Sequence, residues 1–233
     1  MAGAEEPVPD FIEQRITFQD RQSFEILKPL TNYRSCHDGT PKEARMVFTC
    51  RRISPDASTE EYVMKVKTQL PAEGQVPVVH PSTTTEHELK ALTTFHNANS
   101  SFAPQLVGFH CQAQDERGPL PGGFQTFTVM TKMPGYALFG KYWNMSTQDR
   151  DEIIPKAAEA LRSIYALGIE PVDRGMRNVI WDPDTKQCSI IDFELWNETQ
   201  EIFADEKTEL QRWGLIRTPP AKDHWAAWNS MYR

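Results

Sequence analysis

The chain has 233 residues, 39% of them hydrophobic, and a formal net charge of −7, which is enough for one large domain or two lobes around a buried core. The acidic balance, without a basic stripe, disfavours nucleic acid as a bulk partner, and no apolar run reaches the roughly 20 residues that a membrane helix needs. The N-terminus does not resemble a secretion signal and the four cysteines have no metal-ligand spacing, so disulfides are unsupported and we expect a reducing, cytoplasmic location.

The N-terminal half of the chain alternates short β-forming runs with polar connections. Residues 1–20 are predicted to form a flexible extension. Five strands follow, each rich in β-forming residues or alternating in polarity, at residues 24–30, 45–52, 62–67, 105–110 and 124–130. Between the third and fourth strands, Thr85 and Glu88 have the spacing of a capping box and predict the start of a helix. The polar connections favour an antiparallel meander, and residues 133–135, Met-Pro-Gly, are typical of a connector between lobes.

A long helix and a hairpin are predicted in the C-terminal half. Apolar residues within 151–167 recur with helical spacing, and Gly168 is placed to end that helix. The runs 178–181 and 188–193 flank the turn sequence DPDTKQ and predict a β-hairpin. In the remainder of the chain we expect one or two short helices, with the tryptophans as packing anchors.

Three oxygen-bearing side chains fall on the loop and the strand next to that turn. Asp173 opens the loop sequence DRGMRN, Asn178 closes it, and Asp192 follows the second strand of the hairpin. Carboxylate and amide oxygens are ligands that magnesium prefers, and these three can converge on one point. The set suits a nucleophile-orienting group beside a magnesium–phosphate complex. A single aspartate near a turn usually serves the turn itself, but three such ligands at these spacings are uncommon by chance.

A lysine and a glutamate in the N-terminal half form a second candidate pair. Lys65 lies in the third predicted strand, and Glu88 lies in the helix that follows, with Glu86 as a competing acid. The alternative interpretation makes Lys65 an exposed edge-strand lysine, like its neighbour Lys67, and makes Glu88 only a helix cap. The functional interpretation makes Lys65 and Glu88 partners in one site. The order of these two residues along the chain favours it when set beside the resemblance that follows.

This order of elements resembles that of protein kinases and of the related aminoglycoside and choline phosphotransferases. Three strands with a lysine precede a helix with a glutamate, two strands, a connector, a long helix and the Asp…Asn…Asp set. The likeness covers about residues 24–196. It implies an α+β, bilobal protein kinase-like fold, with an antiparallel five-stranded N-lobe over 21–133 and a reduced, mainly helical C-lobe over 134–233.

The resemblance also assigns a role to each candidate residue. It implies that Lys65, paired with Glu88, holds the α- and β-phosphates of ATP. Asp173 would orient, or accept a proton from, the attacking hydroxyl, while Asn178 and Asp192 would hold magnesium. The adenine ring would meet the backbone of a hinge whose candidate residues are Met130, Lys132 and Met133.

Several positions of the loop depart from the protein-kinase pattern. Pro171 stands where these kinases usually carry a histidine, and Val172 replaces an arginine, so control by activation-loop phosphorylation is not expected. Gly175 replaces a lysine, and Arg174 or Arg177 is a candidate for the missing positive charge.

Two further departures concern the nucleotide and the acceptor. Glu194 stands in place of the glycine of the protein-kinase Asp-Phe-Gly motif, which favours small-molecule phosphotransferases. The connection between the first two strands has a single glycine, Gly39, although close backbone approach to phosphates needs glycines. Arg34, His37 or Lys42 is a candidate phosphate contact there, against the simpler interpretation of a polar connection.

Three functions remain open from the sequence. The first is an ATP- and magnesium-dependent phosphotransferase acting on a hydroxyl, of a small molecule rather than of a protein. The second is a pseudokinase that acts as a binding or scaffold protein, which the poor phosphate loop and Pro171 favour. The third is acid–base chemistry by Asp173 and Asp192 on the same fold. Because few residues follow Asp192, a homodimer that completes the short second lobe also stays open.

Overall fold

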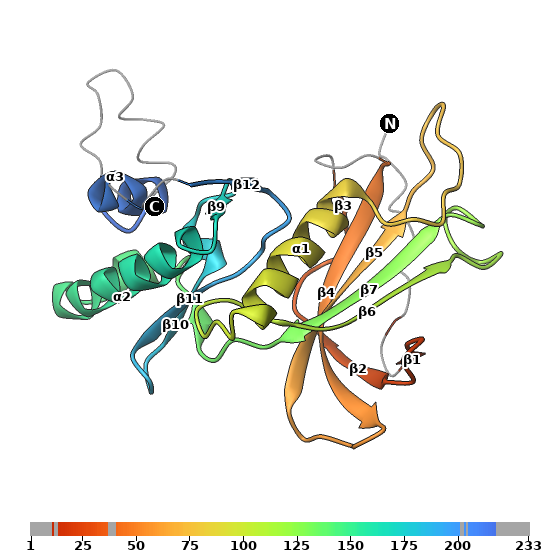
Figure 1. Cartoon of the computed structure of the whole chain (residues 1–233), viewed down its shortest axis with the longest axis horizontal. Coiled ribbons are helices and arrows are strands. Elements are labelled where there is room, and N and C mark those ends of the chain that lie inside the picture. Colours follow the sequence, from red (N-terminus) through yellow and green to blue (C-terminus); the bar gives the residue numbers. More distant parts are fainter. Residues whose placement is uncertain (1–10, 12–13, 37–40, 201–202, 204, 218–233) are drawn as a thin grey trace. The chain divides into compact units, whose positions relative to one another are not determined.

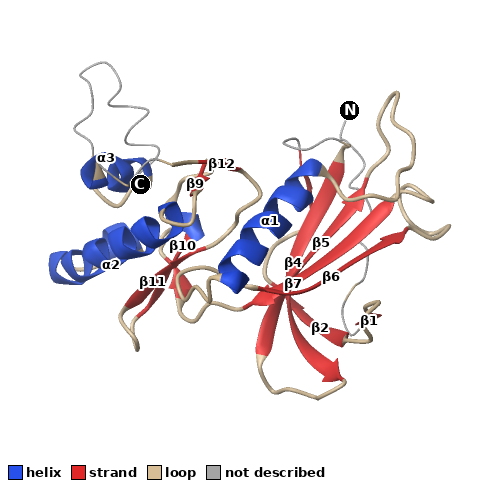
Figure 2. Cartoon of the chain, viewed as in Figure 1, coloured by secondary structure: helices blue, strands red, loops and turns tan. Residues whose placement is uncertain are grey.

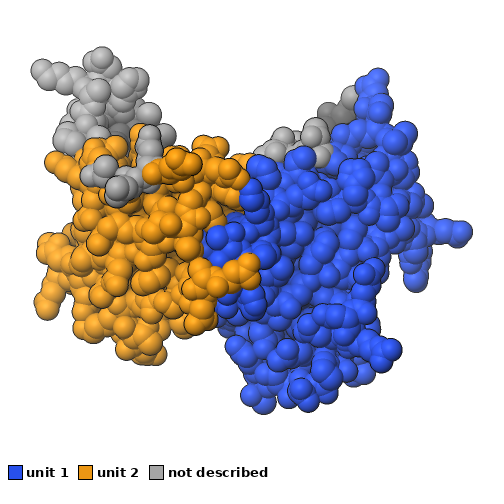
Figure 3. Space-filling view, in the orientation of Figure 1, with its two compact units in different colours: residues 1–96, 105–132 blue, residues 97–104, 133–233 orange. Residues whose placement is uncertain are grey.

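The computed structural model describes residues 11, 14–36, 41–200, 203 and 205–217. The chain divides into two compact units, residues 1–96 with 105–132 (unit 1) and residues 97–104 with 133–233 (unit 2), which Figure 3 colours separately. The segment 97–104 follows the first long helix and belongs to unit 2, although unit 1 continues after it. Unit 1 contains one sheet, and unit 2 contains two smaller ones.

Unit 1 is built on a seven-stranded antiparallel sheet in the order β1-β2-β4-β5-β7-β6, with β3 paired to β4 (Figures 1 and 2). Its strands are β1 (Arg15–Thr17), β2 (Ser23–Pro29), β3 (Arg34–Cys36), β4 (Glu43–Ser54), β5 (Glu61–Gln69), β6 (Leu106–Ala113) and β7 (Phe124–Thr131). All five predicted strands are present, but the prediction of a five-stranded sheet is wrong because β1 and β3 were missed.

The two faces of this sheet differ in chemistry. Since side chains alternate along a strand, Tyr62, Met64 and Val66 of β5 face an apolar core, and Lys65 and Lys67 face the other way. That core also contains the buried rings of residues 11, 18, 24, 48 and 127. Residues 11 and 18 lie in the segment predicted as a flexible extension. Both are buried and residues 15–17 pair with β2, so that prediction is wrong for this part of the segment.

Helix α1 (Thr83–Asn97) lies along the face of the sheet that carries the lysines (Figure 1). The hydroxyl of Ser82 accepts a hydrogen bond from the amide of Thr85 at 3.4 Å. The helix therefore begins two residues before the predicted cap, and the predicted capping box of Thr85 and Glu88 is wrong. Glu88 is instead directed toward the sheet.

Unit 2 combines helices with two small antiparallel sheets. Helix α2 (Thr147–Tyr165) is capped by Ser146, whose hydroxyl accepts from the amide of Asp149 at 3.1 Å. One sheet has the order β11-β10-β8, with β11 (Gln187–Ile190), β10 (Val179–Asp182) and β8 (Tyr136–Ala137), and β9 (Ile169–Pro171) pairs with β12 (Trp196–Glu198). The predicted hairpin is β10–β11, but the third strand of its sheet, β8, and the pair of β9 and β12 were not predicted.

The C-terminal part of unit 2 forms the short helix α3 (Glu206–Arg212), followed by the buried Trp213. The predicted tryptophan anchors at 225 and 228 lie outside the described residues. Short 3-10 turns occur at Tyr142–Asn144 and Met176–Asn178. Among the described residues, no helix combines the length and the apolar character that crossing a bilayer requires.

Three cysteines, Cys50, Cys111 and Cys188, are free thiols. Cys50 lies in the apolar core of unit 1, and Cys188 lies on the buried strand β11. Burial raises the pKa of each of these two thiols to about 12, so both are protonated at neutral pH.

Gly135 holds the connector close to the hairpin of unit 2. Its φ is +99°, and a Cβ built there would lie 2.0 Å from the carbonyl oxygen of Trp181. We expect Gly135→Ala to lower the free energy of unfolding by about 2–5 kcal/mol, since backbone strain and a clash add. Gly140, with φ +73° and no atom within 4 Å of such a Cβ, is the matched control, and Gly140→Ala should cost only about 1–2 kcal/mol. Equal losses for the two variants, measured by urea denaturation, would contradict this account.

Candidate functional site

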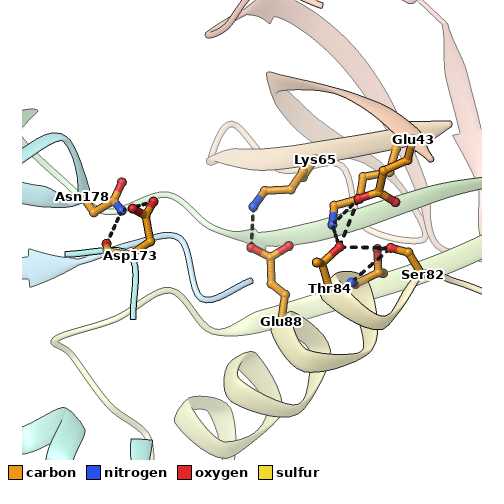
Figure 4. A network of polar contacts seen from close by, with 9 residues as sticks. Glu43, Lys65, Ser82, Thr84, Glu88, Asp173 and Asn178 are labelled. Atoms are coloured by element: carbon orange, nitrogen blue, oxygen red, sulfur yellow. Dashed lines mark hydrogen bonds and ion pairs between the residues drawn. The ribbon is translucent and has the colours of Figure 1, made fainter. Parts of the chain in front are cut away.

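The predicted lysine–glutamate pair is formed within unit 1. Nζ of Lys65 on β5 lies 2.6 Å from Oε1 of Glu88 on α1 (Figure 4). Both side chains are buried, with 8% and 2% of their surface exposed. Because β5 pairs with β4 and β7 on its two sides, Lys65 is not on an edge strand, and that alternative interpretation is wrong. Glu86, the competing acid, is exposed.

A second buried ion pair lies beside the first and was not predicted. Nζ of Lys67 lies 3.1 Å from Oε1 of Glu43 and donates a hydrogen bond to Oγ1 of Thr84 at 2.8 Å (Figure 4). Thr84 in turn donates to the same Glu43 oxygen at 3.0 Å. Burial lowers the pKa of Lys67, against the opposing effect of Glu43 and Glu88. The available signal was the spacing of Lys65 and Lys67 two residues apart, which places both on one face of a strand.

The loop between β9 and β10 brings together two of the predicted residues of unit 2. Nδ2 of Asn178 donates to the carbonyl oxygen of Asp173 at 3.0 Å and to its Oδ2 at 3.3 Å (Figure 4). Asn178 is 4% exposed. The guanidinium of Arg177 forms an ion pair with Oδ1 of Asp173. Both oxygens of the Asp173 carboxylate are therefore in contact with side chains of its own loop.

Asp192 follows the hairpin strand β11, at the end where the same loop enters β10. Val179 pairs with Ile190, and the amide of Ile191 donates to the carbonyl of Asn178 at 2.9 Å. The register thus places Asn178 and Asp192 at the same end of the hairpin. Asp192 has a φ of 67°, in the left-handed region that costs a non-glycine residue about 1–2 kcal/mol. Such conformations cluster at functional sites.

Many solved structures are similar to this chain, although comparisons of sequence find no relative. No protein-family model and no curated protein matches the chain. It is similar to a solved structure, the kinase PK-1 of Cydia pomonella granulovirus, with 17% sequence identity and a TM-score of 0.49. The similar region covers 78% of this chain and 55% of that kinase, so the chain spans about half of its length. We base the functional proposal on side-chain geometry and not on this likeness.

The predicted hinge residues have different surroundings. Met130 on β7 is buried in unit 1 and pairs with Val63 across the sheet. Lys132 is exposed and forms an ion pair with Glu61, and this contact lowers the pKa of the Glu61 carboxyl. Met133 is the first residue after the unit boundary. A contact of these residues with adenine stays a prediction.

The candidate phosphate contacts in the first connection are only partly described. His37 and Gly39 lie outside the described residues. Arg34 lies on β3, opposite Arg45 of β4. The backbone amide of Lys42 donates to the side chain of Gln75 at 3.0 Å. A phosphate contact from this connection stays a prediction.

The two arginines of the loop point to different partners. Arg177 pairs with Asp173 and is therefore the arginine that places positive charge beside it. Arg174 instead contacts Glu170, Glu209 and the hydroxyl of Tyr165. Sequence reasoning left both arginines open and gave no signal for Glu209, which is distant in the chain.

Proposed function

We propose that this chain is an ATP- and magnesium-dependent phosphotransferase of the kinase type, acting on a hydroxyl of a small molecule. The observation that carries the proposal is the buried pair of Lys65 and Glu88, 2.6 Å apart on a central strand and its covering helix. A buried ion pair often contributes no more to folding stability than an apolar pair of similar volume. A lysine kept there is better explained by an anionic ligand such as a nucleotide phosphate.

The donor set of unit 2 fits magnesium. Magnesium takes hard oxygen ligands and is usually bound through one or two carboxylates together with substrate phosphates. Asn178 uses its Nδ2 for Asp173, so its amide oxygen is directed away from that contact. In the proposal, this oxygen and the Asp192 carboxylate would hold the ion, which when bound would supply positive charge beside the phosphates.

Asp173 is proposed to orient the acceptor hydroxyl and to take its proton as the new P–O bond forms. In the same step the bond between the γ-phosphorus and the β,γ-bridging oxygen of ATP breaks, and ADP leaves. Its carboxylate is held by Arg177 and Asn178, so its position is defined before an acceptor arrives, and positioning is the main source of rate in this chemistry. Glu194, where protein kinases carry a glycine, favours a small-molecule acceptor.

A pseudokinase is the second candidate function. The observation that favours it is the ion pair between Arg177 and Asp173, because this contact occupies one carboxylate oxygen that an acceptor hydroxyl would need. A scaffold protein needs neither magnesium nor a free catalytic carboxylate. The two candidates therefore differ in whether ATP with magnesium is bound at all.

Thermal unfolding with ATP and magnesium separates the two candidates. A ligand at about 100 times its dissociation constant adds about 2.7 kcal/mol of stability, so we expect a clear rise in Tm with ATP and magnesium. The rise should be lost in Lys65→Met, and in Asp192→Asn only its magnesium-dependent part should be lost. Lys28→Met, at an exposed lysine of β2, is the control and should retain the full rise. If the Tm of the wild-type protein is unchanged at saturating ATP and magnesium, the scaffold function is favoured.

A further inference from the structure

Arg174, the residue after Asp173, is bound by side chains from three separate elements of unit 2. Its Nε lies 3.1 Å from Oε2 of Glu209 on α3, and its Nη2 lies 2.5 Å from Oε1 of Glu170 on β9. The same Nη2 donates to the hydroxyl of Tyr165, at the end of α2, at 3.2 Å. The Arg174 side chain is 17% exposed and that of Glu209 is 10% exposed. An arginine so enclosed is fixed in position.

The charges around Arg174 keep it protonated. Burial works against the charged guanidinium, but the contacts with Tyr165, Glu209 and Glu170 outweigh it and raise the pKa of Arg174. Burial also raises the pKa of Tyr165 to about 12, so its hydroxyl stays neutral and donates to Oε2 of Glu209 at 3.2 Å. Arg174 and Tyr165 therefore both keep their protons at neutral pH.

Glu209 is itself held in place by α3. The side chain of Asp205 accepts from the amide of Thr208 at 3.1 Å and caps the helix. Leu210 and Trp213 are each 1% exposed and anchor the helix in unit 2. Arg212 pairs with the other oxygen of Glu209 at 2.5 Å, with its own side chain 56% exposed. Oε2 of Glu209 is thus presented to Arg174 from a fixed helix.

A tight backbone turn joins Arg174 to Asp173. The amide of Arg174 donates to the carbonyl of Val172 at 2.9 Å, so the backbone turns tightly at Asp173. On the far side of the loop, Asn178 holds the carbonyl and a carboxylate oxygen of Asp173. Asp173 therefore lies between two anchors, one of which depends on α3.

We propose that Arg174, held by Glu209 of α3, is a positioning residue that sets the Asp173 carboxylate for the reaction. The expected effect on kcat rests on the proposed function. The placement of Asp173 by Arg174 does not. Helix α3 contributes no predicted site residue. In this proposal it nevertheless helps to orient the acceptor hydroxyl, because Glu209 holds Arg174.

The test compares Glu209→Gln with Arg212→Gln in the full chain. Glu209→Gln keeps the shape but removes the charge that binds Arg174, while Arg212→Gln removes only the exposed partner of Glu209. We expect Glu209→Gln to lower kcat by about 100-fold, since a displacement of about 1 Å costs that much, with KM for ATP nearly unchanged. Arg212→Gln should keep the wild-type kcat. A role in stability alone would not lower kcat selectively in folded protein.

Hydrogen exchange supplies a measurement that does not depend on activity. The amides of Arg174 and Asn178 are bonded to the carbonyls of Val172 and Gly175, and both should exchange faster in Glu209→Gln than in Arg212→Gln. If the wild type transfers no phosphate but this exchange is accelerated, the proposed function fails and the positioning role stands. Unchanged exchange in Glu209→Gln overturns the positioning role.

A milder variant keeps the proposal testable if Glu209→Gln does not fold. Arg174→Lys retains the charge but loses the fork that reaches several partners at once, so kcat should fall less than in Arg174→Gln. The double variant Arg174→Gln with Glu209→Gln should lower kcat no further than either change alone, because both changes remove the same contact. Additive losses, or a wild-type kcat in folded Arg174→Gln, would overturn the proposal.

Discussion

Asp173→Asn is expected to lower kcat for phosphoryl transfer by about 10²–10⁴-fold, the usual contribution of a positioned proton acceptor. The amide has the size of the carboxylate but does not take the proton of the acceptor hydroxyl. Because Asp173 is assigned to the acceptor and not to the nucleotide, KM for ATP should change little. Steady-state kinetics with ATP, magnesium and a reactive hydroxyl compound would measure both constants.

Asp151→Asn is the matched control for that variant. Asp151 is an exposed residue of α2, and the same chemical change there should leave kcat and KM at their wild-type values. A wild-type kcat in Asp173→Asn would remove Asp173 from the chemistry and contradict the assignment of the loop. A loss of ATP binding in Asp173→Asn, shown by Tm, would instead move its role from the acceptor to the nucleotide.

The second large effect is expected from the buried pair of Glu43 and Lys67. Both side chains are at most 2% exposed, so Glu43→Leu leaves a buried ammonium group without its carboxylate. Removing one partner of a buried pair costs about 3–5 kcal/mol, and urea denaturation should show a loss of this size. Burial lowers the pKa of Lys67 below its ordinary value of 10.5. Glu43 opposes this lowering, so in Glu43→Leu the pKa of Lys67 falls further and the folded variant loses this proton at a lower pH than the folded wild type. The deficit should therefore shrink as pH rises toward 10.5.

Two further variants separate charge burial from simple loss of packing. Glu43→Leu combined with Lys67→Met should regain most of the loss, since an apolar pair of similar volume often replaces a buried ion pair at little cost. Glu61→Gln breaks the exposed pair with Lys132 and should cost less than about 1 kcal/mol. A loss in Glu43→Leu no larger than in Glu61→Gln would show that the buried pair is not important for stability.

Local patterns in the sequence were enough to predict the longer elements. The strands around Lys65, the long helix before Gly168 and the hairpin at DPDTKQ each have a clear periodicity or turn signal, and the structure contains all of them. The short strands β1 and β3 were missed because three residues are too few to show alternation. Their pairing with β2 and β4 depends on neighbours in the sheet.

Side-chain partnerships were predictable only where a motif linked the two residues. Lys65 and Glu88 were paired by their order in a resembling family, and the structure brings them to 2.6 Å. Glu43 meets Thr84 from 41 positions away, and Arg174 meets Glu209 from 35 positions away. No periodicity connects such distant residues, because their contact is created by the packing of a helix onto a sheet or a loop.

The support of the Asp173 loop by α3 has a consequence for the order of events during protein synthesis. Chains fold from the N-terminus as the ribosome extends them, and Glu209 is among the last described residues to be made. Unit 1 can thus be complete in a nascent chain while Arg174 still lacks its partner on α3. A nascent polypeptide, or a product of premature termination before residue 206, would then carry every predicted site residue while its Asp173 loop lacked the contact with α3.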